Sequence, residues 1–198
     1  AFGASDSKHT TQTKNMDYIN GSLYLSGMMK GGFAPYGEEE ARIASKSTPL
    51  NGFVIKCDAS NGEWLGGVSA DEQGSGGYFG VAKGKENNLY AYGYSWATPN
   101  KGICLTTIDE SSWEKTEKIA LITETGMGTA WSCLADGTNF YSFSRGNKAV
   151  NFYNSEFTLP APTGWGMFIS SWKLDDIATG IETPNLAGND TRIYGVQG

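Results

Sequence analysis

The chain has 198 residues, of which 39% are hydrophobic and 27 are glycine, and its net charge is −6. Only 18% are charged, below the ~25% of a typical domain, which argues against helical bundles and coiled coils. The apolar content excludes global disorder, the acidic balance disfavours binding to nucleic-acid phosphates, and no apolar run reaches the roughly 18 residues of a membrane helix. We therefore expect an all-β protein with many glycine turns, no nucleic-acid partner and no membrane span.

Two patterns recur along the chain and divide it into three units. The first is a glycine or asparagine turn followed by an aromatic strand, at residues 20–27, 87–93 and 136–143. The second is an apolar strand that ends in aspartate, at residues 52–58, 102–109 and 167–175. The first and third units also carry an extension between these patterns, within residues 28–51 and 146–165.

Each unit has room for four short strands. A strand precedes each aromatic strand, at 14–19, 77–83 and 129–135, and a fourth follows the aspartate in two units, at 63–70 and 115–123. Asn-Gly pairs are strong turn signals, and they occur at 20–21, 51–52 and 61–62. The third unit shows no clear fourth strand after Asp175.

Four strands in a unit of about 40–50 residues are typical of a β-propeller blade. The aromatic strand, the strand ending in Asp58 and the following Asn-Gly and Trp64 resemble bacterial β-propeller repeats of the SBBP-like and kelch-like types. In the second unit Trp113 follows Asp109 at a shorter spacing. The resemblance implies a partial β-propeller of about three four-stranded blades within residues 1–177, forming part of a larger propeller, with the blades at about 10–70, 75–124 and 126–177.

The C-terminal region, residues 178–198, is expected to be a linker and the start of a truncated C-terminal β-domain. Its segments 179–181 and 192–198 resemble the beginning of the type IX secretion sorting domain of Bacteroidetes. This resemblance implies a secreted or outer cell-surface protein. An ordinary linker into another β-domain is the alternative. The remaining blades are expected upstream of Ala1, or a second chain completes the ring.

Few residues suit catalysis or metal binding. His9 is the only histidine and lies near a terminus, so a triad or a multi-histidine zinc site has little support. Cys57, Cys104 and Cys133 lie in apolar strands without CxxC spacing and are expected to be small buried side chains. Residues 38–40, three consecutive glutamates, are interpreted as a solvated helical turn. No cofactor, metal or catalytic residue is assigned.

The connections between the second and third strands of each unit are expected on one side of the protein, where long loops concentrate function. Aromatic side chains in these connections are the candidate binding residues: Tyr36, Tyr94, Trp96, Tyr153 and Trp165. We expect a non-catalytic, exported surface protein that binds a protein or glycan partner through these loops. Two alternatives stay open, the propeller part of a secreted polysaccharide- or peptide-degrading hydrolase and a structural module of a surface assembly.

Overall fold

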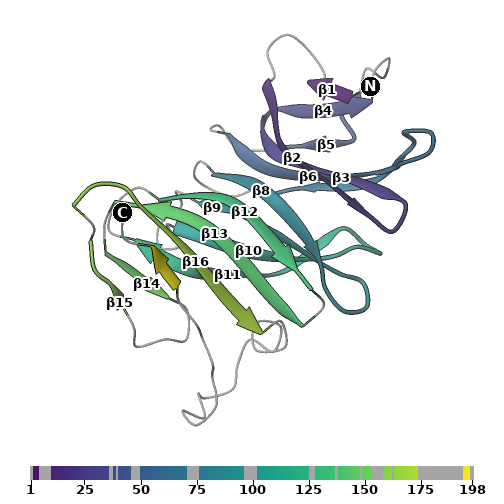
Figure 1. The fold of residues 1–198 in the computed structure, drawn as a ribbon. Helices are drawn as coiled ribbons and strands as arrows, with labels where there is room; N and C mark the ends of the chain where they lie inside the picture. The colour runs from purple at the N-terminus through teal and green to yellow at the C-terminus, as the bar shows by residue number, and fades with distance from the viewer. Residues whose placement is uncertain are drawn as a thin grey trace.

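The structure, a computed structural model, describes residues 2–4, 10–35, 38, 40–45, 50–70, 76–95, 102–124, 128–136, 138–147, 149–152, 158–161, 163–173 and 194–196. The regular elements in these ranges are β-strands, which form antiparallel sheets (Figure 1). The predicted all-β class is therefore confirmed.

The first sheet contains four strands in sequence order: β2 (Thr10–Ile19), β3 (Ser22–Lys30), β6 (Asn51–Asp58) and β7 (Trp64–Ser69). The turn between β2 and β3 is the predicted Asn-Gly pair, with φ of 49° at Asn20 and 80° at Gly21. These left-handed values suit asparagine and glycine and match the twist of a hairpin. The pair at 61–62 also forms a turn, in which Gly62 has φ of 74°.

The predicted turn at residues 51–52 is wrong, because both residues lie at the start of β6. Asn51 is only 1% exposed, and its side-chain amide donates a hydrogen bond to Ser45 Oγ at 2.7 Å. A Cβ atom at Gly52 would lie 2.9 Å from Cδ2 of Tyr78. Here the glycine leaves room for an aromatic ring of the next sheet rather than permitting a turn.

Two further sheets follow along the chain. The second sheet contains β8 (Gly76–Lys83), β9 (Asn88–Ser95), β10 (Gly102–Asp109) and β11 (Glu114–Glu124). The third contains β12 (Gly128–Ala135), β13 (Asn139–Gly146), β16 (Gly166–Lys173) and β17 (Tyr194–Val196). The predicted strands correspond to these elements, and the C-terminal strand β17 takes the fourth position of the third sheet by pairing with β16.

The extension of the first unit forms part of a cap. Its strands β4 (Gly32–Pro35) and β5 (Ile43–Ala44) pair with each other, and β1 (Phe2–Ala4) adds to β4. Phe33 of this cap sheet packs against Phe53 and Trp64, with ring centroids 5.1 and 6.3 Å away. The cap sheet therefore covers one face of the first sheet over β6, β7 and part of β3, and we call this face the outer face of the first sheet.

The extension of the third unit crosses to a neighbouring sheet. Its strands are β14 (Val150–Phe152) and β15 (Thr158–Leu159), and β14 pairs antiparallel with β11 of the second sheet. Both extensions were expected to decorate one side of the protein as loops. Instead, part of each is strand that adds to or covers a sheet, because short segments gain stability by using the open edges and faces beside them.

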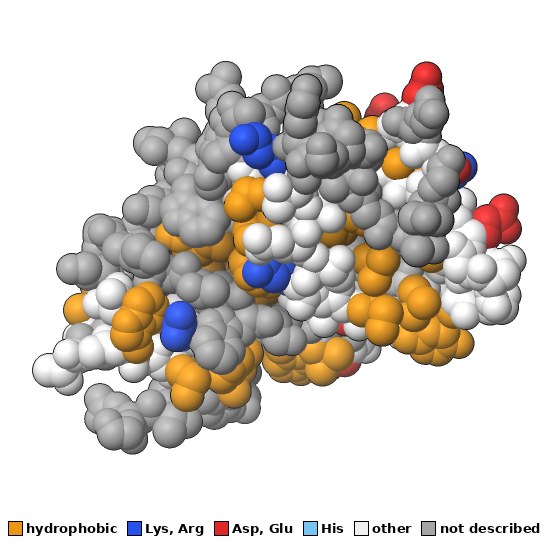
Figure 2. All heavy atoms as spheres, turned by 90° about the horizontal axis from the view of Figure 1, so that it is seen from above, with side chains coloured by type: hydrophobic (Ala, Val, Ile, Leu, Met, Phe, Trp, Pro, Cys, Tyr) orange, Lys and Arg blue, Asp and Glu red, His pale blue; other side chains and the backbone are white. Residues whose placement is uncertain are grey.

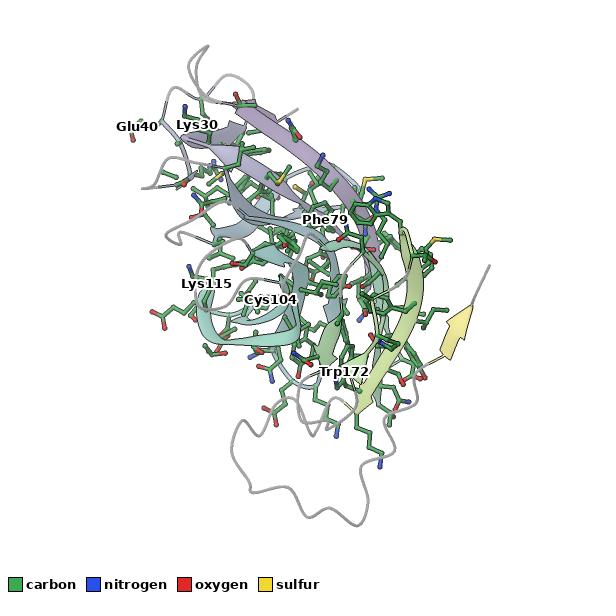
Figure 3. The ribbon with its side chains drawn as sticks, turned by 90° about the vertical axis from the view of Figure 1, so that its left-hand side faces the viewer. Lys30, Glu40, Phe79, Cys104, Lys115 and Trp172 are labelled. Carbon is green, nitrogen blue, oxygen red and sulfur yellow. The ribbon has the colours of Figure 1, made fainter. Side chains whose placement is uncertain are left out.

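The second sheet is packed between the other two (Figures 1 and 3). On one side, Tyr24 and Val54 of the first sheet share a core with Leu89 of the second. On the other side, the ring of Tyr92 in the second sheet lies 5.6 Å from that of Phe140 in the third. Figure 3 shows the three sheets in series, with Cys104 on the second and Trp172 on the third. The described core is thus a face-to-face stack.

Gly66 provides the first test of this packing. It lies in β7, where an added Cβ would overlap the indole of Trp113, which packs into the core between the first and second sheets. We expect Gly66→Ala to lower the free energy of unfolding by about 2 kcal/mol through overpacking, measured by urea unfolding. Gly164→Ala is the matched control, since nothing lies within 4 Å of the added atom. Equal effects of the two substitutions would show that Trp113 does not occupy this place.

Candidate functional site

Glu110, in the turn after β10, accepts hydrogen bonds from three side chains. Its carboxylate accepts hydrogen bonds from the Tyr24 hydroxyl and the Lys56 ammonium group, each at 2.5 Å, and from Lys83 Nζ. The side chain of Glu110 is only 10% exposed. Tyr24 and Lys56 belong to the first sheet, whereas Lys83 and Glu110 belong to the second. The Glu110 cluster therefore joins two sheets.

The environment keeps these groups in fixed protonation states. Burial by itself would raise the pKa of Glu110, but hydrogen bonds from Lys56, Lys83 and Tyr24 outweigh it and lower the pKa to about 2. Desolvation and the hydrogen bond to Glu110 raise the pKa of Tyr24 well above its usual value. At neutral pH the carboxylate is charged and the phenol protonated, and the acceptor oxygens are occupied. A perturbed pKa can mark a catalytic acid or base; here the hydrogen bonds of the carboxylate link the first sheet to the second.

Sequence reasoning did not find the Glu110 cluster, because its members come from four separate segments. The available signal was weak: Tyr24 and Lys56 are opposite each other in the β3–β6 ladder, so they share a face of the first sheet. The residue of the next unit that contacts Tyr24 and Lys56 is determined by how the sheets stack. The sequence pattern of a strand carries no information about that stacking.

The low pKa of Glu110 predicts a pH-dependent contribution to stability. Because its pKa is depressed in the folded state, the contribution is complete above the ordinary value near 4.5 and is lost as the pH falls from there to about 2. We expect Glu110→Gln to reduce the free energy of unfolding by about 2 kcal/mol at pH 7, since Lys56 and Lys83 lose their countercharge. The difference from wild type should shrink as the pH falls toward 2 in urea unfolding series. The exposed Glu114→Gln is the control, and a pH-independent difference for Glu110→Gln would contradict the assignment.

The structure describes two of the five predicted binding residues. Tyr94 lies in β9 and is 2% exposed, so it is part of the interior in this conformation. Trp165 directly precedes β16 and is 49% exposed. The two belong to different sheets. Tyr36, Trp96 and Tyr153 lie outside the described residues.

Trp165 is paired with a cation. The guanidinium carbon of Arg145 lies 4.5 Å from the centroid of its ring, a close cation–π geometry. Arg145 is near the end of β13, opposite Met167 of β16. Trp165 therefore sits at the end of the third sheet where β13 connects to β16, which is the kind of connection expected to carry binding residues. We call this feature the Trp165–Arg145 pair.

The third sheet also has an open apolar face. Phe140 and Phe168 are buried, and Phe140 packs against Tyr92 of the second sheet, whereas Leu134 of β12 and Met167 and Ile169 of β16 are exposed. The exposed fractions are 65% for Leu134, 54% for Met167 and 45% for Ile169. The ladder puts Met167 beside Arg145, and Ile169 beside Phe143. We call this surface the outer face of the third sheet. Figure 2 shows that hydrophobic side chains reach the surface in patches as well as singly.

The carboxylates at the strand ends act as turn caps, as predicted. Asp58 accepts hydrogen bonds from Ser60 N at 2.7 Å and Ser60 Oγ at 2.5 Å, and Asp109 accepts the equivalent pair from Ser111 at 2.8 and 2.6 Å. These bonds lower the pKa of both aspartates. Such local contacts fix the turn conformation. Asp175 lies outside the described residues.

The glutamate run is only partly as expected. Glu38 and Glu40 are exposed, but neither is helical. Glu38 instead pairs with Arg42, whose guanidinium lowers the pKa of that carboxyl. The backbone N–H of Arg42 donates to the carbonyl of Phe33 at 3.0 Å, which ties this segment to β4. Glu39 lies outside the described residues.

Cysteines and acidic residues offer no metal centre in the part of the chain that the structure describes. Cys57 and Cys104 are buried, as expected for small core side chains. Within the same ranges, no group of three or more histidine, cysteine, aspartate or glutamate side chains is placed to hold a metal ion. A search of these residues for a helix long and apolar enough to cross a membrane also finds none. The side chain of Cys133, and His9, lie outside the description.

Comparisons with known proteins add no relative. No protein-family model matches the chain, and a search of curated proteins finds no match. Functional inference therefore rests on the residues and their geometry alone.

Proposed function

We propose that this chain is a non-catalytic binding protein built from propeller-type blades, which recognises a protein partner through the end of the third sheet that carries Trp165. Three consecutive antiparallel sheets packed face to face, two of four strands and one of four strands extended by β14 and β15, support the blade interpretation. The resemblance of the C-terminal region to a type IX sorting domain supports an exported, surface-located protein. A non-catalytic role is favoured because the carboxylate of Glu110, whose pKa is strongly lowered, is engaged in linking two sheets.

The observation that carries this proposal is the exposed Trp165–Arg145 pair. Tryptophan and arginine are the residues most enriched at the energetic centres of protein interfaces. The stacked guanidinium restrains the indole, which reduces the entropy lost when a partner binds. The neighbouring side chains Met167 and Ile169 are apolar and exposed, which suits a protein surface better than a sugar, whose hydroxyl groups need several polar partners.

The test compares Trp165→Ala with wild type. Each protein, immobilised, is exposed to cell-surface extract from the source organism, and the retained proteins are quantified. We expect at least one retained protein to fall about tenfold or more with Trp165→Ala, the loss typical of an interface hot spot. Leu65→Ala is the control, because Leu65 is 45% exposed but lies on β7 of the first sheet.

Two results would contradict the proposal. Equal retention by wild type and Trp165→Ala would remove Trp165 from any interface. Trp165-dependent binding on a glycan array, with unchanged protein retention, would replace the protein partner with a carbohydrate. Urea unfolding of both variants checks that the exposed substitutions leave the fold intact.

A further inference from the structure

The two ends of the sheet stack both expose apolar side chains. At one end is the outer face of the third sheet, with Leu134, Met167 and Ile169. At the other end, Met16 and Tyr18 of β2 are 60% and 69% exposed. Met16 is opposite Leu25 in the ladder, and Leu25 packs with the core beneath the cap sheet, so Met16 belongs to the outer face of the first sheet.

The cap sheet covers only part of that face. Phe33 and Ile43 pack over Phe53 and Trp64, which lie in β6 and β7. The β2 portion stays open, and it is the first strand of its sheet. Exposed large hydrophobic side chains are thus present on the first strand at both ends of the stack: Met16 and Tyr18 in β2, and Leu134 in β12.

First strands already contact one another inside the chain. β8 lies against β2 on one side and against β12 on the other. Figure 1 shows β2, β8 and β12 following one another across the molecule. Each contact joins the first strand of one sheet to the first strand of the next, as in a propeller, where first strands surround the central axis. The next contact in this series would join β12 to the β2 strand of another copy of the chain.

We propose that a second copy of this chain covers these faces, with β12 of each copy packed against β2 of the other. This inference rests on the blade arrangement in the proposed function and does not depend on the Trp165–Arg145 pair. The two contacts are equivalent by a two-fold axis, so the assembly is closed. It contains six sheets, three from each copy, within the roughly 4–8 blades of known propellers.

The second copy is the occupant that the observations favour. A sheet face stacked on the outer face of the third sheet continues the two interfaces already present, which are also apolar sheet-on-sheet contacts. This chain itself provides the complementary open first strand, in β2. A direct contact between two third sheets would instead bring Arg145 and Lys173 of both copies onto one interface, since their positions share the outer face, and would leave Met16 and Tyr18 uncovered.

Sedimentation velocity of the 198-residue chain over a wide concentration range tests this assembly. We expect a species of twice the 21.3 kDa chain mass. Ile169→Lys and Tyr18→Lys should each weaken self-association about tenfold or more, because each places a charge in one of the two contacts. Leu65→Lys, on a residue as exposed as Ile169, is the matched control and should associate like wild type.

Mixing the two weakened variants distinguishes the arrangement. The third sheet of Tyr18→Lys and the first sheet of Ile169→Lys are both unaltered, so an equimolar mixture keeps one intact contact. We expect the mixture to contain more dimer than either variant alone. If third sheets pack on each other, Tyr18→Lys will dimerise like wild type and mixing will restore nothing, which overturns the proposal.

Two other outcomes would also overturn the proposal. A wild-type chain that stays monomeric at every concentration shows that no second copy covers these faces. Growth into species larger than a dimer shows an open arrangement instead of a closed pair. Tyr18→Lys lies on β2 of the first sheet and leaves Trp165, Met167 and Ile169 unchanged, so partner retention measured with this variant reports on the proposed function separately. If self-association fails while partner retention is preserved, this inference is overturned and the proposed function is not.

Discussion

The need to cover the apolar faces of its sheets is the constraint on which this structure depends. A sheet buries its apolar side chains only where another layer lies against it, and each middle layer needs two neighbours. The second sheet has both, and residues that alternate along β9, such as Leu89 and Tyr90, are therefore buried on opposite faces. The first sheet receives the cap sheet over part of its outer face. The third sheet has no such cover among the described residues.

Polar groups in the stack fix how the layers are aligned. Apolar sheet faces can slide past each other at little cost, whereas a buried carboxylate tolerates few positions. Glu110 has its partners only when the turn after β10 lies beside Tyr24 and Lys56. The Tyr92 hydroxyl is hydrogen-bonded to Ser144 Oγ, which links the second sheet to the third. Within the third sheet, Ser142 Oγ and Ser170 Oγ are hydrogen-bonded at 2.7 Å. Buried polar links of this type contribute more to a unique alignment than to net stability.

Local patterns predicted the strands but not their neighbours. Aromatic strands after glycine or asparagine turns, and apolar strands ending in aspartate, correctly indicated β3, β6, β9 and β10, because these signals act between neighbouring residues. The cap sheet was missed, since β4 and β5 are short and are stabilised by contacts of Phe33 with distant rings. The turn predicted at residues 51–52 is wrong because the glycine at position 52 makes room for the ring of Tyr78. Likewise, Tyr94 and Trp165 look alike as aromatic residues at strand ends, and only the stacking of sheets buries one and exposes the other.

The proposed binding end and the proposed assembly faces share Met167 and Ile169 of the third sheet, and their other residues differ. Trp165 lies where β13 connects to β16, at the ends of strands, whereas Met16, Tyr18 and Leu134 project from strand faces. A two-fold axis along the centre of a closed ring relates the copies without inverting them, so both Trp165 ends face the same way. Two partner sites on one side of a rigid particle raise the effective concentration for a second contact. Self-association would therefore strengthen binding to a multivalent or clustered partner without changing any contact at Trp165.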